Sequence, residues 1–225
     1  MSLYFWIIIS IVSIPLLLSF ERRISYFKKW PNVFSSIFLV GSFYVAWDMI
    51  ATWVKDWSFN SAYVGSFKIV NLPIEEVLFF VVVPFSCIFI YEVICYFSKK
   101  NDDVEYNKNI IYIFIVFLMA LALRFQDQSY TAMSLILLAG FFFLSVNFFK
   151  GIVFKKNFFA YILICYAPFL VFNGILTGIP VVSYNSASIW GARILSIPVE
   201  DFIYNFTFLG FSLIVYEMMT RRKAL

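Results

Sequence analysis

Pro73-Ile74-Glu75-Glu76-Val77-Leu78-Phe79 returns 125 residues later as Pro198-Val199-Glu200-Asp201-Phe202-Ile203-Tyr204. The same offset relates Tyr91-Glu92 to Tyr216-Glu217, and segments 48–92 and 173–217 are identical at 11 of 45 positions. Self-similarity at a fixed offset indicates an internal duplication. Each copy places two carboxylates at the start of an apolar run, where charge is costly and therefore needs a reason.

The composition is that of an integral membrane protein. Apolar side chains make up 63% of the 225 residues, charged side chains make up 13%, and the mean hydropathy is +0.89. A soluble fold of this length has too little interior to bury so much apolar surface. We therefore predict an all-α membrane fold, because helices satisfy their own backbone hydrogen bonds inside a bilayer.

The composition also excludes several kinds of chemistry. The chain has no histidine, which removes imidazole acid–base catalysis and His-ligated iron, zinc or haem. Cys87, Cys95 and Cys165 lie in apolar runs without metal-type spacing, so we interpret them as core residues. There is no glycine-rich phosphate-binding motif, and the N-terminal stretch lacks the basic start and cleavage site of a signal peptide. We expect no metal and no cofactor.

Apolar runs of about 20 residues predict seven membrane spans. They cover approximately residues 3–20, 33–54, 73–97, 109–124, 130–149, 157–178 and 198–219. Spans one to three map onto spans five to seven at the repeat offset, and the short fourth span has no counterpart. We predict a first repeat at 1–97, a joining span with its loops at 98–127, and a second repeat at 128–225. Because four spans return the chain to its starting side, the repeats should be parallel.

Basic residues predict the orientation, because they are enriched on the cytoplasmic side. Thirteen of the 17 lie on one predicted side: Arg22, Arg23, Lys28, Lys29, Lys99, Lys100, Lys108, Lys150, Lys155, Lys156, Arg221, Arg222 and Lys223. The others are Lys55, Lys68, Arg124 and Arg193. We predict a multi-pass protein of the cell (inner) membrane with its N-terminus outside and its C-terminus in the cytoplasm. The basic C-terminal tail should hold the last span at anionic lipid, not bind nucleic acid.

The candidate catalytic groups are the four carboxylates of the repeated motif, Glu75, Glu76, Glu200 and Asp201. Pro73 and Pro198 suit the first turn of a helix, where carboxylates also complement the helix dipole, so a purely structural role is the alternative. The pairs recur in both copies, however, with little basic charge nearby. Like charges crowded in a low dielectric disfavour one another's ionisation, so some of these groups should keep a proton and act as general acids.

Other residues repeat beside the motif. The supporting polar residues lie one helical turn apart in each copy and in the same outer half: Asp48, Thr52, Asn173 and Thr177. Phe79 and Tyr204 lie one turn beyond the first carboxylate of each pair. We predict that they line a substrate site, where aromatic faces stabilise a cation, with plain packing as the alternative for either ring. Segments 55–72 and 178–197 should cap the helices or lie against the bilayer. At the opposite ends, Tyr91-Glu92 and Tyr216-Glu217 favour interfacial anchoring with salt bridges.

The doubled Pro-x-Glu-(Glu/Asp) motif resembles the membrane-integral lycopene cyclase domain family. The segment from Trp47-Asp48 to Thr52, then Trp57, Phe59 and the Phe-Ile-Tyr-Glu ending at Glu92, is similar to the first half of that family. The resemblance covers nearly the whole chain. It favours the fused form of cyclases that are built from two small subunits in some bacteria.

The resemblance implies an enzyme of carotenoid biosynthesis, a lycopene β-cyclase-type intramolecular lyase or isomerase. An acid protonates the terminal double bond of an acyclic ψ-end, the neighbouring double bond attacks the cation, and a base removes a ring proton to leave a β-ionone ring. The four motif carboxylates would be the acid and base, without an assignment of which is which. No cofactor takes part. Its partners would be a lipophilic carotenoid and membrane lipid, with other carotenoid-pathway enzymes as candidates.

Two alternatives stay open at this point. A proton-coupled membrane transporter also uses carboxylates inside the membrane, although the polar cluster here lies only in the outer half. A cyclase acting on a different carotenoid would carry the same motifs. A retinal protein is disfavoured, because span 198–219 has no lysine for a Schiff base.

Overall fold

The computed structural model of the protein describes residues 2–98 and 102–222. In chain order its elements are α1 (Leu3–Leu18), η1 (Tyr26–Lys29), α2 (Trp30–Ser36), η2 (Ile37–Gly41), α3 (Ser42–Trp53), β1 (Trp57–Phe59), β2 (Lys68–Ile69), β3 (Leu72–Pro73), α4 (Ile74–Phe97), α5 (Lys108–Arg124), α6 (Ser129–Asn147), α7 (Lys150–Val153), α8 (Lys156–Gly178), β4 (Val182–Tyr184), β5 (Arg193–Ile194), β6 (Ile197–Pro198) and α9 (Val199–Arg222).

Within these residues the protein is mostly helical and built for a bilayer. Five helical stretches are long and apolar enough to cross a membrane: Tyr26–Trp53, Ile74–Phe97, Ser129–Asn147, Lys156–Gly178 and Val199–Thr220. Helix α1 is a shorter apolar helix, and α5 has 17 residues. Large apolar side chains such as Leu17, Phe38 and Leu163 remain exposed on the outside, where lipid would cover them. The described residues are therefore compatible with an all-α integral membrane protein.

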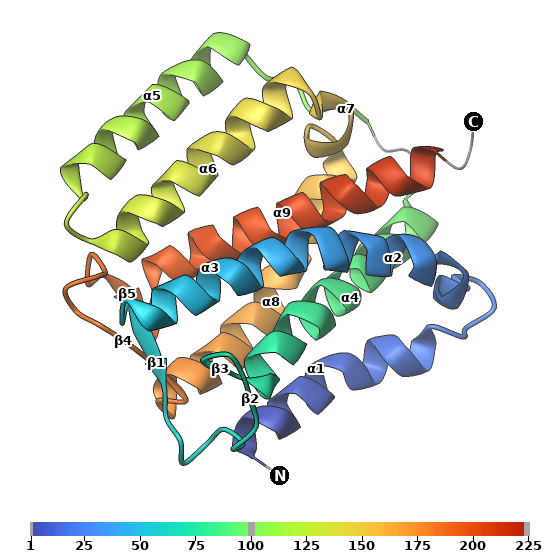
Figure 1. Ribbon diagram of the computed structural model, residues 1–225. Coiled ribbons are helices and arrows are strands. Elements are labelled where there is room, and N and C mark those ends of the chain that lie inside the picture. The colour runs from blue at the N-terminus through green and yellow to red at the C-terminus, as the bar shows by residue number, and fades with distance from the viewer. Residues whose placement is uncertain (1, 99–101, 223–225) are drawn as a thin grey trace.

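The long helices lie side by side, with the N-terminus at one end of the bundle and the last helix ending at the other (Figure 1). Helix α4 packs against α1 and α8, while α9 packs against α6 and α2. Helices α5 and α6 form a neighbouring pair at one edge. The two motif-bearing helices, α4 and α9, both begin at the end where the short strands gather (Figure 1).

Short strands cover that end of the bundle. Strand β1 pairs antiparallel with β4, and Ser58 pairs with Ser183, its counterpart at the repeat offset. The hairpins β2–β3 and β5–β6 lead into α4 and α9 with equivalent registers, since Lys68 pairs with Pro73 and Arg193 with Pro198. The segments that were expected to cap the helices thus contain paired strands, which the sequence did not predict.

The helix starts differ slightly from the predicted ones. Pro73 lies in β3 with an extended backbone (φ −57°, ψ 145°) and caps α4, which begins at Ile74. The proline therefore precedes the first turn, and Glu75 and Glu76 still fall within it. Pro198 has the same place before α9. The second predicted span, 33–54, starts earlier, at Tyr26, and contains a π-helical turn.

Candidate active site

One cavity beneath the paired strands brings together residues from both halves of the chain. Its polar lining consists of Asp48, Glu76, Asn173, Asp201 and Asn205, and its aromatic lining includes Tyr4, Trp57, Phe79, Tyr130, Tyr184 and Tyr204. The cavity has a volume of about 70 Å³. Phe79 and Tyr204, the predicted substrate-lining residues, both belong to this lining.

Asp48 and Glu76 form a carboxyl pair on one wall. The indole N–H of Trp57 donates to Oδ1 of Asp48 at 2.5 Å, and the Thr52 hydroxyl donates to the same oxygen at 3.4 Å. The hydroxyl of Tyr4 donates to Oε2 of Glu76 at 2.7 Å. Glu76 is close enough for the charge of Asp48 to act on it. Both carboxyl groups are buried, so they share a site of low dielectric.

Asp201 lies on the opposite repeat and accepts three hydrogen bonds. Tyr130 donates to Oδ1 at 2.7 Å, while Asn173 and Tyr184 each donate to Oδ2 at 2.8 Å. Part of Tyr184 is accessible, but its hydroxyl is buried against Asp201. Burial, followed by the charge of Asp201, raises the pKa of the Tyr184 hydroxyl well above its ordinary value. The hydroxyl therefore keeps its proton and remains a hydrogen-bond donor.

The two carboxyl sites correspond in position and differ in chemistry. Tyr4 and Tyr130 play the same part, although they are 126 residues apart instead of 125. Asn173 occupies the place of Asp48, so Asp201 has a neutral amide where Glu76 has a second carboxyl group. The duplicated positions therefore differ: Glu76 lies next to a second carboxyl group, that of Asp48, whereas Asp201 accepts three hydrogen bonds from neutral donors.

Glu75 and Glu200 lie beside the cavity and are not part of its lining. The backbone N–H groups of Gly65 and Trp190, again 125 residues apart, donate to Oε1 of Glu75 and Glu200 at 2.7 Å. A hydroxyl adds a second bond to each oxygen, from Ser2 on Glu75 and from Thr131 on Glu200 at 2.6 Å. These contacts tie the start of each motif helix to the preceding loop and to the first helix of the same half.

The predicted supporting residues divide in the same way. Asp48 and Asn173 lie in the cavity wall, whereas Thr52 and Thr177 are outside it. The Thr177 hydroxyl bonds the carbonyl of Asn173 at 2.8 Å and the hydroxyl of Ser196 at 2.7 Å, so it holds α8 against the β5–β6 hairpin.

Cations do not neutralise this cluster among the side chains that the structure describes. The ion pairs among the described residues lie outside the cluster: Arg23–Glu21, Lys29–Glu92, Lys155–Asp103 and Lys156–Asp102. Lys68 and Arg193 are the basic residues that precede the two motifs in the sequence. The Arg193 guanidinium donates to the carbonyl of Ser196 and lies over the ring of Tyr184, 5.9 Å from its centroid.

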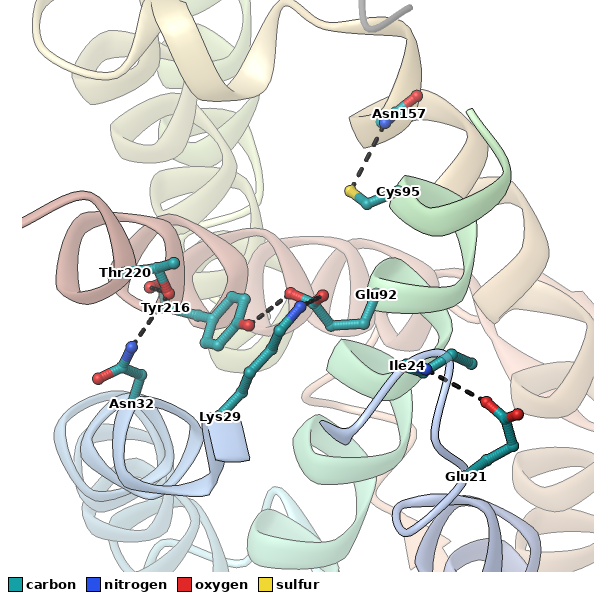
Figure 2. Close-up of polar contacts among 9 residues, drawn as sticks. All are labelled: Glu21, Ile24, Lys29, Asn32, Glu92, Cys95, Asn157, Tyr216 and Thr220. Carbon is teal, nitrogen blue, oxygen red and sulfur yellow. Dashed lines mark hydrogen bonds and ion pairs between the residues drawn. The ribbon is translucent and has the colours of Figure 1, made fainter. Parts of the chain in front are cut away.

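A separate polar group lies at the far end of the bundle (Figure 2). Glu92 forms an ion pair with Lys29 and accepts a hydrogen bond from the hydroxyl of Tyr216. At the repeat offset, Tyr91 interacts with Glu217. These reciprocal contacts join α4 to α9 and fit the structural role expected for both pairs. Of the predicted salt-bridge partners there, Lys99 and Lys100 and the side chains of Arg221 and Arg222 lie outside the described residues, as does Lys223 in the tail.

The sequence did not predict several residues of the cavity lining, among them Tyr4, Tyr130 and Asn205. Tyr4 and Tyr130 were not recognised as equivalent because they are 126 residues apart, one more than the offset of the motif. Asn205 is a lone amide in an apolar helix, and its counterpart in the first half is Phe80. Asn205 is buried, and its Nδ2 has no hydrogen-bond partner among the described residues.

Comparison with known proteins points to one family. The sequence model described as lycopene cyclase matches residues 1–94 and 127–219, one segment in each half of the chain. No curated protein and no solved structure matches the chain significantly.

Proposed function

The chain belongs to the lycopene cyclase family, and from that premise we propose that it closes the acyclic ends of a carotenoid into β-ionone rings by proton-initiated, non-redox chemistry. The observation that carries the proposal is the cavity shared by Asp48, Glu76 and Asp201. It offers carboxyl groups on two walls, aromatic rings between them and no described cation. This is a lining suited to moving protons around a carbocation.

The Asp48–Glu76 pair is the proposed acid. Like charges crowded in a low dielectric disfavour one another's ionisation, so we propose that this buried pair keeps one proton. Tyr4 donates to Glu76 and holds its carboxyl group in the cavity wall. We assign Glu76 as the group that delivers the proton to the terminal double bond and Asp48 as the residue that keeps Glu76 protonated.

Asp201 is the proposed base. Three donated hydrogen bonds stabilise a carboxylate far better than they stabilise a carboxylic acid, because the acid must point its own O–H away from a donor. A carboxylate on the wall opposite Glu76 is suited to remove the ring proton after cyclisation. Proton gain and proton loss balance, so the product is an isomer of the substrate.

Aromatic rings are the proposed stabilisers of the cation between these steps. Tyr204 packs against Trp47 with 4.9 Å between ring centroids, and Trp57 packs against Tyr130 at the same separation. Such faces attract positive charge without donating a nucleophile. Packing fixes the rings before the substrate arrives, which limits the reorganisation required in the transition state.

Glu75 and Glu200 receive a positioning role in this proposal. Their contacts to Gly65 and Trp190 fix the first turns of α4 and α9, and these turns carry Glu76 and Asp201. Each also has an Oε2 atom that is buried without a partner among the described residues.

The proposed architecture is seven spans in two parallel repeats, 1–97 and 128–225, joined by 98–127. Its support is the matched pairing of Ser58 with Ser183 and the common starting end of α4 and α9. The proposed orientation has the carboxyl cavity in the outer half, the N-terminus outside and the C-terminus in the cytoplasm. Basic residues in the α1–α2 connection and around α7 support this orientation.

Pigment extraction from a bacterial host that accumulates lycopene tests the function. Expression of the chain should convert lycopene to monocyclic or bicyclic β-carotene-type products, whose number of rings reports one-end or two-end processing. Unchanged lycopene, with the protein detected in the membrane, would contradict the proposed substrate. Recovery of rings other than β-ionone would contradict the proposed ring type alone.

A further inference from the structure

An apolar groove runs along the outside of the bundle between α1, α4 and α8. It has a volume of about 290 Å³ and a lining that is almost entirely apolar, from Phe79 and Val83 on α4 to Ile14 on α1 and Phe172 on α8. Ile14 is 65% exposed, so the groove opens toward the surface that lipid would cover. Pro15 and Pro168 lie in its walls.

The groove is continuous with the carboxyl cavity. Four residues line both: Phe79, Phe169, Asn173 and Asn205. Asn205 stands at this junction with its side-chain Nδ2 buried and unpartnered among the described residues. A buried amide at the meeting point of an apolar groove and an acidic cavity is a costly feature for packing alone, because an unpaired polar group loses its hydration without compensation.

The equivalent depression, between α3, α6 and α9, does not reach the carboxyl cavity. It has a similar volume of about 310 Å³ and a lining that includes Leu137, Phe211 and Val215, but it shares no lining residue with the carboxyl cavity. Bulky counterparts fill the passage at the repeat offset. Phe80 replaces Asn205 and Phe208 replaces Val83, and their rings pack 5.5 Å apart, centroid to centroid.

We infer that the groove between α1, α4 and α8 is the entrance for the polyene, which moves in from the bilayer with its acyclic end first while the rest of the chain lies against α4. The inference rests on the proposed function and adds the binding route and its asymmetry. The duplication has therefore produced one active site served by one entrance, and a substrate with two ends must be released and turned before its second end is cyclised.

The dimensions fit an extended apolar chain. From Phe79 to Ile90 the groove follows α4 for eleven residues, or about 16 Å at 1.5 Å per residue. It thus reaches from the carboxyl layer to approximately the middle of a hydrocarbon core that is about 30 Å thick. Apart from Ser10, Ser86, Asn173 and Asn205 the lining offers no polar side chain other than thiols, so it favours a linear hydrocarbon over a polar ligand.

Paired substitutions in the two grooves test the inference. Ser86→Phe places in the open groove the residue that its counterpart, Phe211, supplies in the equivalent depression. Ile90→Phe narrows the inner end, and Val215→Phe is its matched control at the equivalent position of α9. The readout is the initial rate of lycopene conversion in membranes with equal amounts of protein. We expect Ser86→Phe and Ile90→Phe to lower it at least tenfold and Val215→Phe to change it less than twofold.

A binding measurement separates this inference from the proposed chemistry. The Asp201→Asn protein, purified in detergent from lycopene-rich membranes, should retain the polyene, seen as its visible absorption per mole of protein. Adding Ile90→Phe should remove most of that absorption, while adding Val215→Phe should not. Wild-type rates in both groove variants, with retained pigment, would overturn the inference even if the wild-type protein is a cyclase. Pigment that is retained but never converted by the wild-type protein would overturn the proposed function and leave the groove in place.

Discussion

The substitution Asp201→Asn separates catalysis from folding. In the folded protein, Tyr130 donates to Oδ1 of Asp201, and Asn173 and Tyr184 both donate to Oδ2. An asparagine that keeps its oxygen on the Oδ2 side retains two of these bonds. Its amide N–H₂ then faces the Tyr130 hydroxyl, which can rotate and accept. We therefore expect a stability loss of about 1 kcal/mol, typical of one altered hydrogen bond.

The effect on turnover should be far larger. An asparagine cannot accept the ring proton, and removal of a positioned general base costs about 10²–10⁴-fold in rate. The rate of lycopene conversion should fall by that factor in membranes that contain the same amount of folded protein. Tyr184→Phe leaves the carboxylate and removes one donor, worth about 1.5–3 kcal/mol to a charged acceptor, so its loss should be an intermediate ~10–100-fold.

Asp103→Asn is the matched control, because Asp103 is exposed and pairs with Lys155 far from the cavity. Its rate should equal that of the wild-type protein. If Asp201→Asn folds normally and retains more than a third of the wild-type rate, Asp201 is not the base and the reasoning from its three donors fails.

Four further predictions follow from the same contacts. Glu76→Gln should lower the conversion rate by about 10²–10⁴-fold; a rate within threefold of wild type would remove it as the acid. Glu75→Gln and Glu200→Gln retain an oxygen for the loop N–H, so each should cost less than tenfold, and losses as large as that of Glu76→Gln would return them to the catalytic set. Glu92→Gln should lower the thermal unfolding midpoint in detergent by an amount equivalent to about 1 kcal/mol with activity retained at lower temperature, and lost activity with an unchanged midpoint would argue against a structural role. Reporter fusions should find the N-terminus outside and the C-terminus inside; both ends on one side would mean that one predicted span does not cross.

The repeat made much of the fold predictable from the sequence. Proline and glutamate at a fixed offset place two helix starts in equivalent positions, and long apolar runs leave few alternatives to spanning helices. The paired strands β1 and β4 escaped because each has three residues, too short to show the alternation of a strand. Their pairing depends on the two halves meeting, which a local pattern does not encode.

The candidate site was predictable only in part. Glu76, Asp201, Asp48 and Asn173 were identified because each belongs to a repeated pattern. The sequence did not predict that Glu76 lines the cavity and Glu75 does not. Neighbouring residues on a helix point about 100° apart, and only the packing of α3, α4 and the loop decides which of the two faces the cavity. The open groove depends on smaller residues, Val83 and Ser86, at positions where the second repeat has Phe208 and Phe211. The sequence shows this difference, but only the packed helices show that it opens a groove.

Cyclisation in heavy water tests the central claim most directly. Membranes that contain the protein are equilibrated in ²H₂O and supplied with lycopene, and the product is analysed by mass spectrometry. A proton delivered by a carboxyl group comes from the solvent and stays in the ring, so each ring formed should carry one deuterium. Rings formed without deuterium would contradict proton-initiated cyclisation and, with it, the roles assigned to Glu76 and Asp201.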